Sequence, residues 1–128
     1  MGCEFEQLPG LEVVVDRVVY SPELDAPPDR PHPFVYFLTI RNGSDQPVTV
    51  RGRKWVVTDR LGHKTVIEGE GVVGRTPRLD PGESFSYNSC HVVACSSSAE
   101  GGFLAVLDNG KPVCIPIPRF ELAVPEPA

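Results

Sequence analysis

The amino-acid sequence predicts an all-β domain built as an antiparallel β-sandwich. The chain contains 12 glycines and 14 prolines, which favours short strands joined by tight turns over long helices. Runs rich in β-branched and aromatic residues recur at a spacing of roughly ten residues, with turn signals between them. No segment has the pattern of a helix. We therefore expect about seven to eight strands arranged in two sheets.

Each strand is expected where such a run lies between turn-forming residues. The first run, Leu11–Tyr20, is rich in valine, and the proline-rich stretch Ser21–Pro33 after it is predicted to be an exposed connection. In Phe34–Ile40, alternate positions share one face. The later strands are expected, in chain order, at Val48–Thr58 (two short strands around Gly52, or one strand with a bulge there), Lys64–Glu68, Phe85–Val93, Phe103–Leu107 and Val113–Leu122.

The chain has 128 residues, which is enough for one domain and not for two. We expect a flexible N-terminal segment at 1–10, the sandwich at 11–122 and a flexible tail at 123–128. Ser96–Gly102 is predicted to be a flexible loop, since each of its residues is small or polar. The predicted structural core residues are Trp55, Phe85, Tyr87 and Phe120.

Composition argues against several kinds of partner. The net charge is −5 and the pI about 5.1, whereas a protein that binds duplexes usually has a basic face. The one basic cluster, Arg51, Arg53 and Lys54 with Arg60 nearby, is equally well explained as a solvated strand edge. No apolar run approaches the ~20 residues of a membrane span, and the N-terminus lacks a signal sequence. We expect a cytoplasmic protein that binds neither nucleic acid nor membrane.

The 4 cysteines are predicted to be free thiols in a reducing compartment. They are Cys3, Cys90, Cys95 and Cys114, and no two of them have the close spacing of a structural zinc site. Cys90 and His91 are adjacent on an expected strand, so their side chains point to opposite faces and cannot share one metal. We expect no metal and no cofactor.

The segment Gly69–Gly74 has the spacing G-x-G-x-x-G, which allows two interpretations. As a phosphate cradle, its backbone N–H groups would bind a pyrophosphate or nucleotide, with Arg75 and Arg78 as the nearby cations. As structure, the glycines Gly69, Gly71 and Gly74 would permit bulges, positive φ or close backbone approach. The prolines that follow cannot begin the helix of a dinucleotide fingerprint, so the structural interpretation is favoured. No catalytic triad is recognisable, and we predict no catalytic residue.

These patterns together resemble the signature of the ApaG (CorD) domain family over Leu11–Leu122. Any one of the matches is weak, but their occurrence in order is highly specific. They are, in chain order, Phe34, Tyr36, Leu38, Ile40 and Asn42; Arg53, Trp55, Val57, Thr58, Asp59 and Gly62; Gly69, Gly71, Val72, Val73, Gly74, Pro77, Leu79, Pro81, Gly82, Phe85, Tyr87 and Ser89; and Ile117, Pro118, Phe120 and Leu122.

The resemblance implies an immunoglobulin/fibronectin-III-like sandwich, often dimeric, with no established catalytic activity. It also implies a link with cobalt and magnesium tolerance in bacteria, and protein recognition where the domain is appended to eukaryotic proteins. The chain departs from the family at Lys54, at Arg75 and over Ser97–Phe103. The function expected is that of a non-enzymatic, homodimeric protein-binding module. The alternative is a pyrophosphate or nucleotide binder that uses Gly69–Gly74; a hydrolase is the least favoured.

Overall fold

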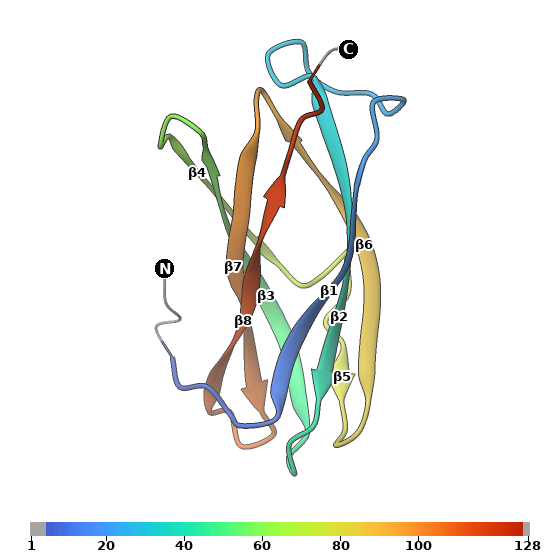
Figure 1. The fold of residues 1–128 in the computed structure, drawn as a ribbon. Helices are drawn as coiled ribbons and strands as arrows, with labels where there is room; N and C mark the ends of the chain where they lie inside the picture. The colour runs from blue at the N-terminus through green and yellow to red at the C-terminus, as the bar shows by residue number, and fades with distance from the viewer. Residues whose placement is uncertain (1–4, 127–128) are drawn as a thin grey trace.

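The computed structural model describes residues 5–126, which fold into two antiparallel sheets (Figure 1). The predicted antiparallel β-sandwich is therefore confirmed. Within residues 5–126 there is no helix long and apolar enough to cross a bilayer. The three-stranded sheet has the order β1 (Leu11–Tyr20), β2 (His32–Asn42), β6 (Ser84–Val93). The five-stranded sheet has the order β4 (Lys64–Glu70), β3 (Val48–Asp59), β7 (Ser97–Leu107), β8 (Pro112–Leu122), and the short β5 (Arg78–Leu79) pairs with β3.

The hydrophobic core lies between the inner faces of the two sheets. Trp55 of β3 is 1% exposed and Phe120 of β8 is 9% exposed, so both are core residues. Phe85 and Tyr87 lie on β6, an edge strand, and are only partly buried against that core. Other large side chains that are fully buried are Leu38, Ile40, Phe103, Ile115 and Leu122. The hydrophobic effect of burying these two apolar faces is the main stabilising term.

β3 is one continuous strand with a bulge, which resolves the two interpretations of its sequence. The register between β3 and β7 shifts between Val50 and Gly52. Val48 and Val50 are fully buried before the shift, and Trp55 is buried after it. The extra residue at the bulge therefore keeps both halves of the strand facing the core.

β7 corrects the prediction of a flexible loop at Ser96–Gly102. Ser97–Gly102 form the first half of a central strand, with β3 on one side and β8 on the other. Small residues have low β-propensity, and that led to the loop prediction. Here they are needed for close packing, because a Cβ at Gly101 would overlap the carbonyl oxygen of Lys54 on β3. Tertiary packing overrides local propensity in this segment.

The described part of the segment before β1 lies beside β8. The N–H of Cys114 donates to the carbonyl of Glu6 at 2.8 Å, and the ammonium of Lys111 lies 2.7 Å from the carboxylate of Glu6. Leu8 packs against the core, and the carbonyl of Gly10 accepts a hydrogen bond of 2.7 Å from the loop after β2. These contacts connect residues 6–10 to both sheets.

The cysteines differ from the prediction of free thiols at one described position. Cys114 is disulfide-bonded, whereas Cys90 and Cys95 are free. Cys3 lies outside the described residues. Composition pointed to free thiols, but a single sequence does not show which segments meet. That residues 6–10 pack beside β8, the strand that carries Cys114, is a contact that only the tertiary structure shows.

Candidate functional site

The glycine-rich segment connects β4 to β5 and forms a tight turn. The N–H of Val72 donates to the carbonyl of Arg75 at 2.7 Å, and the N–H of Arg75 donates back at 2.9 Å. Between them, Val73 and Gly74 both have positive φ, as in a type I′ turn. Val72 is fully buried and connects the turn to the core. The structure therefore supports the structural interpretation of this G-x-G-x-x-G spacing.

Several backbone donors that a phosphate cradle would use are already engaged. The N–H of Gly71 donates to the carbonyl of Arg51 at 2.7 Å. The N–H groups of Val72 and Arg75 close the turn. A nest binds an anion through successive N–H groups that point outward together. A phosphate that used these three N–H groups would have to break these bonds.

Of the two predicted cations of the loop, Arg78 is already paired with carboxylates. Arg78 makes ion pairs with Asp80 and with Asp108, the latter at 2.8 Å. Arg75 is exposed. Two carboxylates beside one guanidinium neutralise the charge that would attract a phosphate.

We therefore expect no nucleotide-dependent stabilisation. A ligand at a hundredfold excess over its Kd would stabilise the native state by about 2.7 kcal/mol. Melting curves with and without millimolar ATP, GTP or inorganic pyrophosphate should coincide. A saturable rise in Tm that is lost in Arg75→Ala would contradict the structural interpretation.

At two glycines of the segment, an added Cβ would come close to neighbouring atoms. A Cβ at Gly69 would lie 2.6 Å from the guanidinium of Arg53. That guanidinium donates to the carbonyls of Glu70 at 2.7 Å and of Gly71 at 3.1 Å. At Gly71, φ is +64° and a Cβ would overlap a carbonyl oxygen across the turn. Gly74 has φ of +78° and no neighbour within 4 Å, so only its backbone conformation requires glycine.

Val73 is the described non-glycine residue with positive φ, at 45°. A β-branched residue there is strained, by about 1–2 kcal/mol, and the side chain is 50% exposed, so little burial offsets the strain. We expect Val73→Gly to raise the free energy of unfolding by about 1 kcal/mol in urea titration. Gly74→Ala, which introduces a Cβ at positive φ, should lower it by a similar amount. A loss of stability in Val73→Gly would show that the valine side chain makes a stabilising contact.

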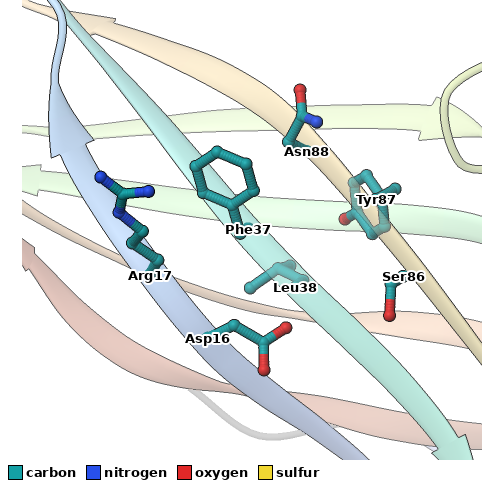
Figure 2. Close-up of a pocket in the computed structure, with 7 residues that line it drawn as sticks. All are labelled: Asp16, Arg17, Phe37, Leu38, Ser86, Tyr87 and Asn88. Carbon is teal, nitrogen blue, oxygen red and sulfur yellow. The ribbon is translucent and has the colours of Figure 1, made fainter.

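The outer face of the three-stranded sheet carries a shallow hollow of about 410 Å³ (Figure 2). Figure 2 shows the ring of Phe37 at its centre, with Arg17 on one side and Asn88 on the other. The guanidinium of Arg17 lies 5.7 Å from the centroid of the Phe37 ring, a cation–π distance. The lining residues come from all three strands: Asp16, Arg17, Phe37, Leu38, Ser86, Tyr87 and Asn88.

A chain of hydroxyl groups borders this hollow. The hydroxyl of Thr39 donates to the carboxylate of Asp16 at 2.6 Å, which leaves the hydroxyl of Ser86, 2.8 Å away, to donate to Thr39. A histidine beside the hydroxyl group is the common arrangement that activates a serine nucleophile. His91 shares β6 with Ser86 but lies on the opposite face, and the other histidines bond to partners elsewhere. The hollow therefore offers two hydroxyl groups and the carboxylate of Asp16 beside an aromatic ring.

An aromatic cluster fills the interior between β2, β3 and β6. The ring of His91 stacks on Tyr36 at 4.7 Å between centroids and meets Trp55 edge-on at 4.6 Å. Burial lowers the pKa of His91 to about 4 and raises the pKa of Tyr36, so both are neutral at pH 7. Nε2 of His91, Nε1 of Trp55 and the Tyr87 hydroxyl are buried, with no hydrogen-bond partner within the described chain.

Sequence reasoning found only part of this cluster. Trp55 and Tyr87 were predicted as core residues, and Tyr36 was assigned to one face of its strand. His91 was not assigned to the core, because histidines are intermediate in burial and its stacking partners lie on other strands. Its position on β6, in phase with Phe85 and Tyr87, is the signal that would have identified it.

β4 is one edge of the five-stranded sheet, with no strand of residues 5–126 paired to its outer side, and the β3–β4 hairpin projects at the upper left of Figure 1. Apart from Gly69, every residue of β4 is exposed. Val66 is 54% and Ile67 is 39% exposed, and Leu61 at the hairpin tip is 73% exposed. β4 contains no proline and its register with β3 has no bulge, so two common protections of an edge strand are absent. Such a strand can accept another strand beside it.

Comparison with known proteins decides the family. The family model described as the ApaG domain matches residues 22–106. The chain belongs to the ApaG family. It is 35% identical over 113 residues to Protein ApaG of Bdellovibrio bacteriovorus, covering 88% of this chain and 89% of that one. It is 41% identical over 108 residues to Protein ApaG of Salmonella arizonae, covering 84% and 86%.

Solved structures agree with this assignment to the ApaG family. The structure described as the putative ApaA protein from Bordetella pertussis has 31% identity and a TM-score of 0.78, over 96% of this chain and 99% of that one. A structural-genomics target, SoR45, has 30% identity and a TM-score of 0.81, over 91% and 88%. A putative late embryogenesis abundant protein, At2g46140.1, has 12% identity and a TM-score of 0.56 over 92% and 73%, which shows a shared fold alone.

Proposed function

We propose that this ApaG-family domain is a non-enzymatic protein-binding module that works as a homodimer. The free edge of β4, with Val66 and Ile67 exposed, supports the proposal most directly. A strand added to such an edge gains affinity from main-chain hydrogen bonds and specificity from alternate side chains. The family resemblance implies the same kind of role.

The features of the two other candidate sites support binding over chemistry. At the glycine turn, the N–H groups of Gly71, Val72 and Arg75 are engaged, which argues against the nucleotide alternative. At the outer hollow, Ser86 has no histidine base on its face of β6. Within residues 5–126, no group of three or more His, Cys, Asp or Glu residues is placed to hold a metal ion. We propose that any link with cobalt or magnesium tolerance acts through a protein partner.

Photo-crosslinking from β4 tests the proposal. We expect benzoylphenylalanine at position 66 to form a cross-link with a polypeptide in the native cell, since Val66 lies on the free edge. The matched control is position 104, because Leu104 is also an exposed apolar residue, on the central strand β7. Mass spectrometry would identify the cross-linked chain, whether a second copy or another protein. Absence of any cross-linked polypeptide at position 66, or equal yields at both positions, would contradict the proposal.

We also propose that the domain acts in the cytoplasm, where most disulfides are kept reduced. Cys114 should then be reduced in cells that are quenched with acid and alkylated, and oxidised after purification in air. Peptide mapping measures both states, and the free thiol Cys90 serves as the internal control. An oxidised Cys114 in quenched cells would indicate an oxidising compartment instead.

A further inference from the structure

We infer that β4 pairs antiparallel with β4 of a second copy, across a two-fold axis at Val66. The inference rests on the proposed protein-binding role and names both the partner and the register. An isologous contact of this kind uses the same surface on both subunits. It would join the two five-stranded sheets into one continuous sheet through their β4 edges.

The backbone groups that face the free edge follow from the ladder with β3. The N–H of Asp59 donates to the carbonyl of His63 at 2.9 Å, so these two residues form a hydrogen-bonded pair. In an antiparallel ladder such pairs alternate with non-bonded ones. The odd-numbered residues of β4 therefore bond to β3. Lys64, Val66 and Glu68 direct their N–H and C=O groups to the free edge.

The charges of β4 are complementary to themselves in the antiparallel direction. With the axis at Val66, Lys64 lies opposite the partner's Glu68, and the reverse pair forms by symmetry. Val66 then lies opposite its own copy, so the apolar centre meets an apolar centre. A parallel arrangement would align lysine with lysine and glutamate with glutamate, which is destabilising. The charges of Lys64 and Glu68 therefore favour β4 of a second copy, in antiparallel orientation, as the strand that pairs with this edge.

The side-chain pairs and the available backbone groups also select the register between the two β4 strands. A shift of the axis to Ile67 would place Val66 opposite the partner's Glu68 and would need the backbone of Glu70. The carbonyl of Glu70 already accepts a hydrogen bond from Arg53. With the axis at Val66, the bonded residues are Lys64, Val66 and Glu68, and Glu70 is not used.

Side chains on the outer face of β3 extend both the charged pairs and the apolar centre of the β4 contact. The ammonium of Lys54 lies 3.7 Å from the carboxylate of Glu68, so the dimer places Glu68 between Lys54 and the partner's Lys64. Val56, which is 6% exposed, lies beside Val66 in the register of the two strands. In the dimer, Val56 and Val66 of the two copies therefore form an apolar row across the axis. On each side of it, lysine and glutamate side chains alternate. Cross-strand pairs of both kinds stabilise antiparallel sheets.

A charge-swap series, measured by sedimentation velocity over a wide micromolar range, tests the pairing. We expect the wild-type chain to dimerise with increasing concentration. Lys64→Glu alone and Glu68→Lys alone should each weaken the homodimer about tenfold or more, because each places like charges opposite each other twice. An equimolar mixture of the two variants should form a heterodimer, and the double variant should recover the homodimer.

Two further variants keep the test specific to β4. Val66→Lys should give a monomer, since it places two ammonium groups together at the axis. Glu121→Lys is the matched control on β8, at the other edge of the same sheet, and should leave the dimer unchanged. Circular dichroism checks that each variant remains folded.

A wild-type monomer throughout the range, or a dimer that the charge swaps do not alter, would overturn the self-pairing. This result is separate from a failure of the proposed function. A cross-link from position 66 to a different polypeptide would preserve the protein-binding role even if the domain is monomeric.

Discussion

Gly101→Ala is expected to destabilise the domain by about 3 kcal/mol, the largest effect of any single glycine substitution here. Gly101 lies on β7 opposite Trp55, where β7 is central in its sheet. A Cβ at this position would overlap the carbonyl oxygen of Lys54, which is backbone and cannot rotate away. The two strands would have to separate beside Trp55, an aromatic core residue that is only 1% exposed.

Urea titration of Gly101→Ala against Gly110→Ala isolates this steric effect. Gly110 has φ of +86° and no atom within 4 Å of the position that an added methyl group would occupy, so its substitution should cost only the backbone strain of about 1 kcal/mol. Gly71→Ala should fall between them, because it combines positive φ with an overlap across the turn that is smaller than the overlap at Gly101. Equal losses at Gly101 and Gly110 would mean that β3 and β7 can separate at little cost.

Acid is expected to destabilise the domain through His91. Its pKa in the folded state is lowered to about 4 by burial, from the ordinary value of 6.5, which the ring regains in the unfolded chain. Between these two values the unfolded state binds the proton and the folded state does not. The stabilisation is therefore fully present above pH 6.5 and is lost as the pH falls to about 4. The loss amounts to about 3 kcal/mol.

His91→Phe should remove this dependence, since it keeps a flat ring against Tyr36 and Trp55 and has no titrating nitrogen. It also removes Nε2, a buried atom without a hydrogen-bond partner within the described chain, so stability at pH 7 should change little. The measurement is the free energy of unfolding at several pH values from 4 to 7 for the wild type, His91→Phe and the exposed-ring control His63→Gln. Parallel pH profiles for the wild type and His91→Phe would contradict the assignment.

The fold could be predicted largely from local patterns. Alternation in β2 and the turn signals around it are properties of short stretches, because side chains in a strand alternate between faces whatever the rest of the chain does. Trp55 was predicted as a core residue because a large apolar side chain in mid-strand has few other stable positions. The family, too, could be predicted, since its motifs are ordered along the chain.

The candidate sites depended on contacts that local patterns do not contain. The spacing of Gly69–Gly74 fits both a phosphate cradle and a structural turn, and the hydrogen bonds of Gly71 and Arg75 that favour the turn cannot be read from the spacing. The hollow around Phe37 joins residues from three strands, so no single stretch of sequence indicates it.

By itself, the sequence determined the class of fold, the family and most strand positions of this protein, because each rests on periodicity or on ordered motifs. The tertiary structure alone decided that Ser97–Gly102 is a central strand, that Cys114 is disulfide-bonded and that β4 is left as a free edge. The physical reason is common to all three. Each depends on which distant segment lies alongside, and that is set by packing of the whole chain and not by the preferences of its neighbours in sequence.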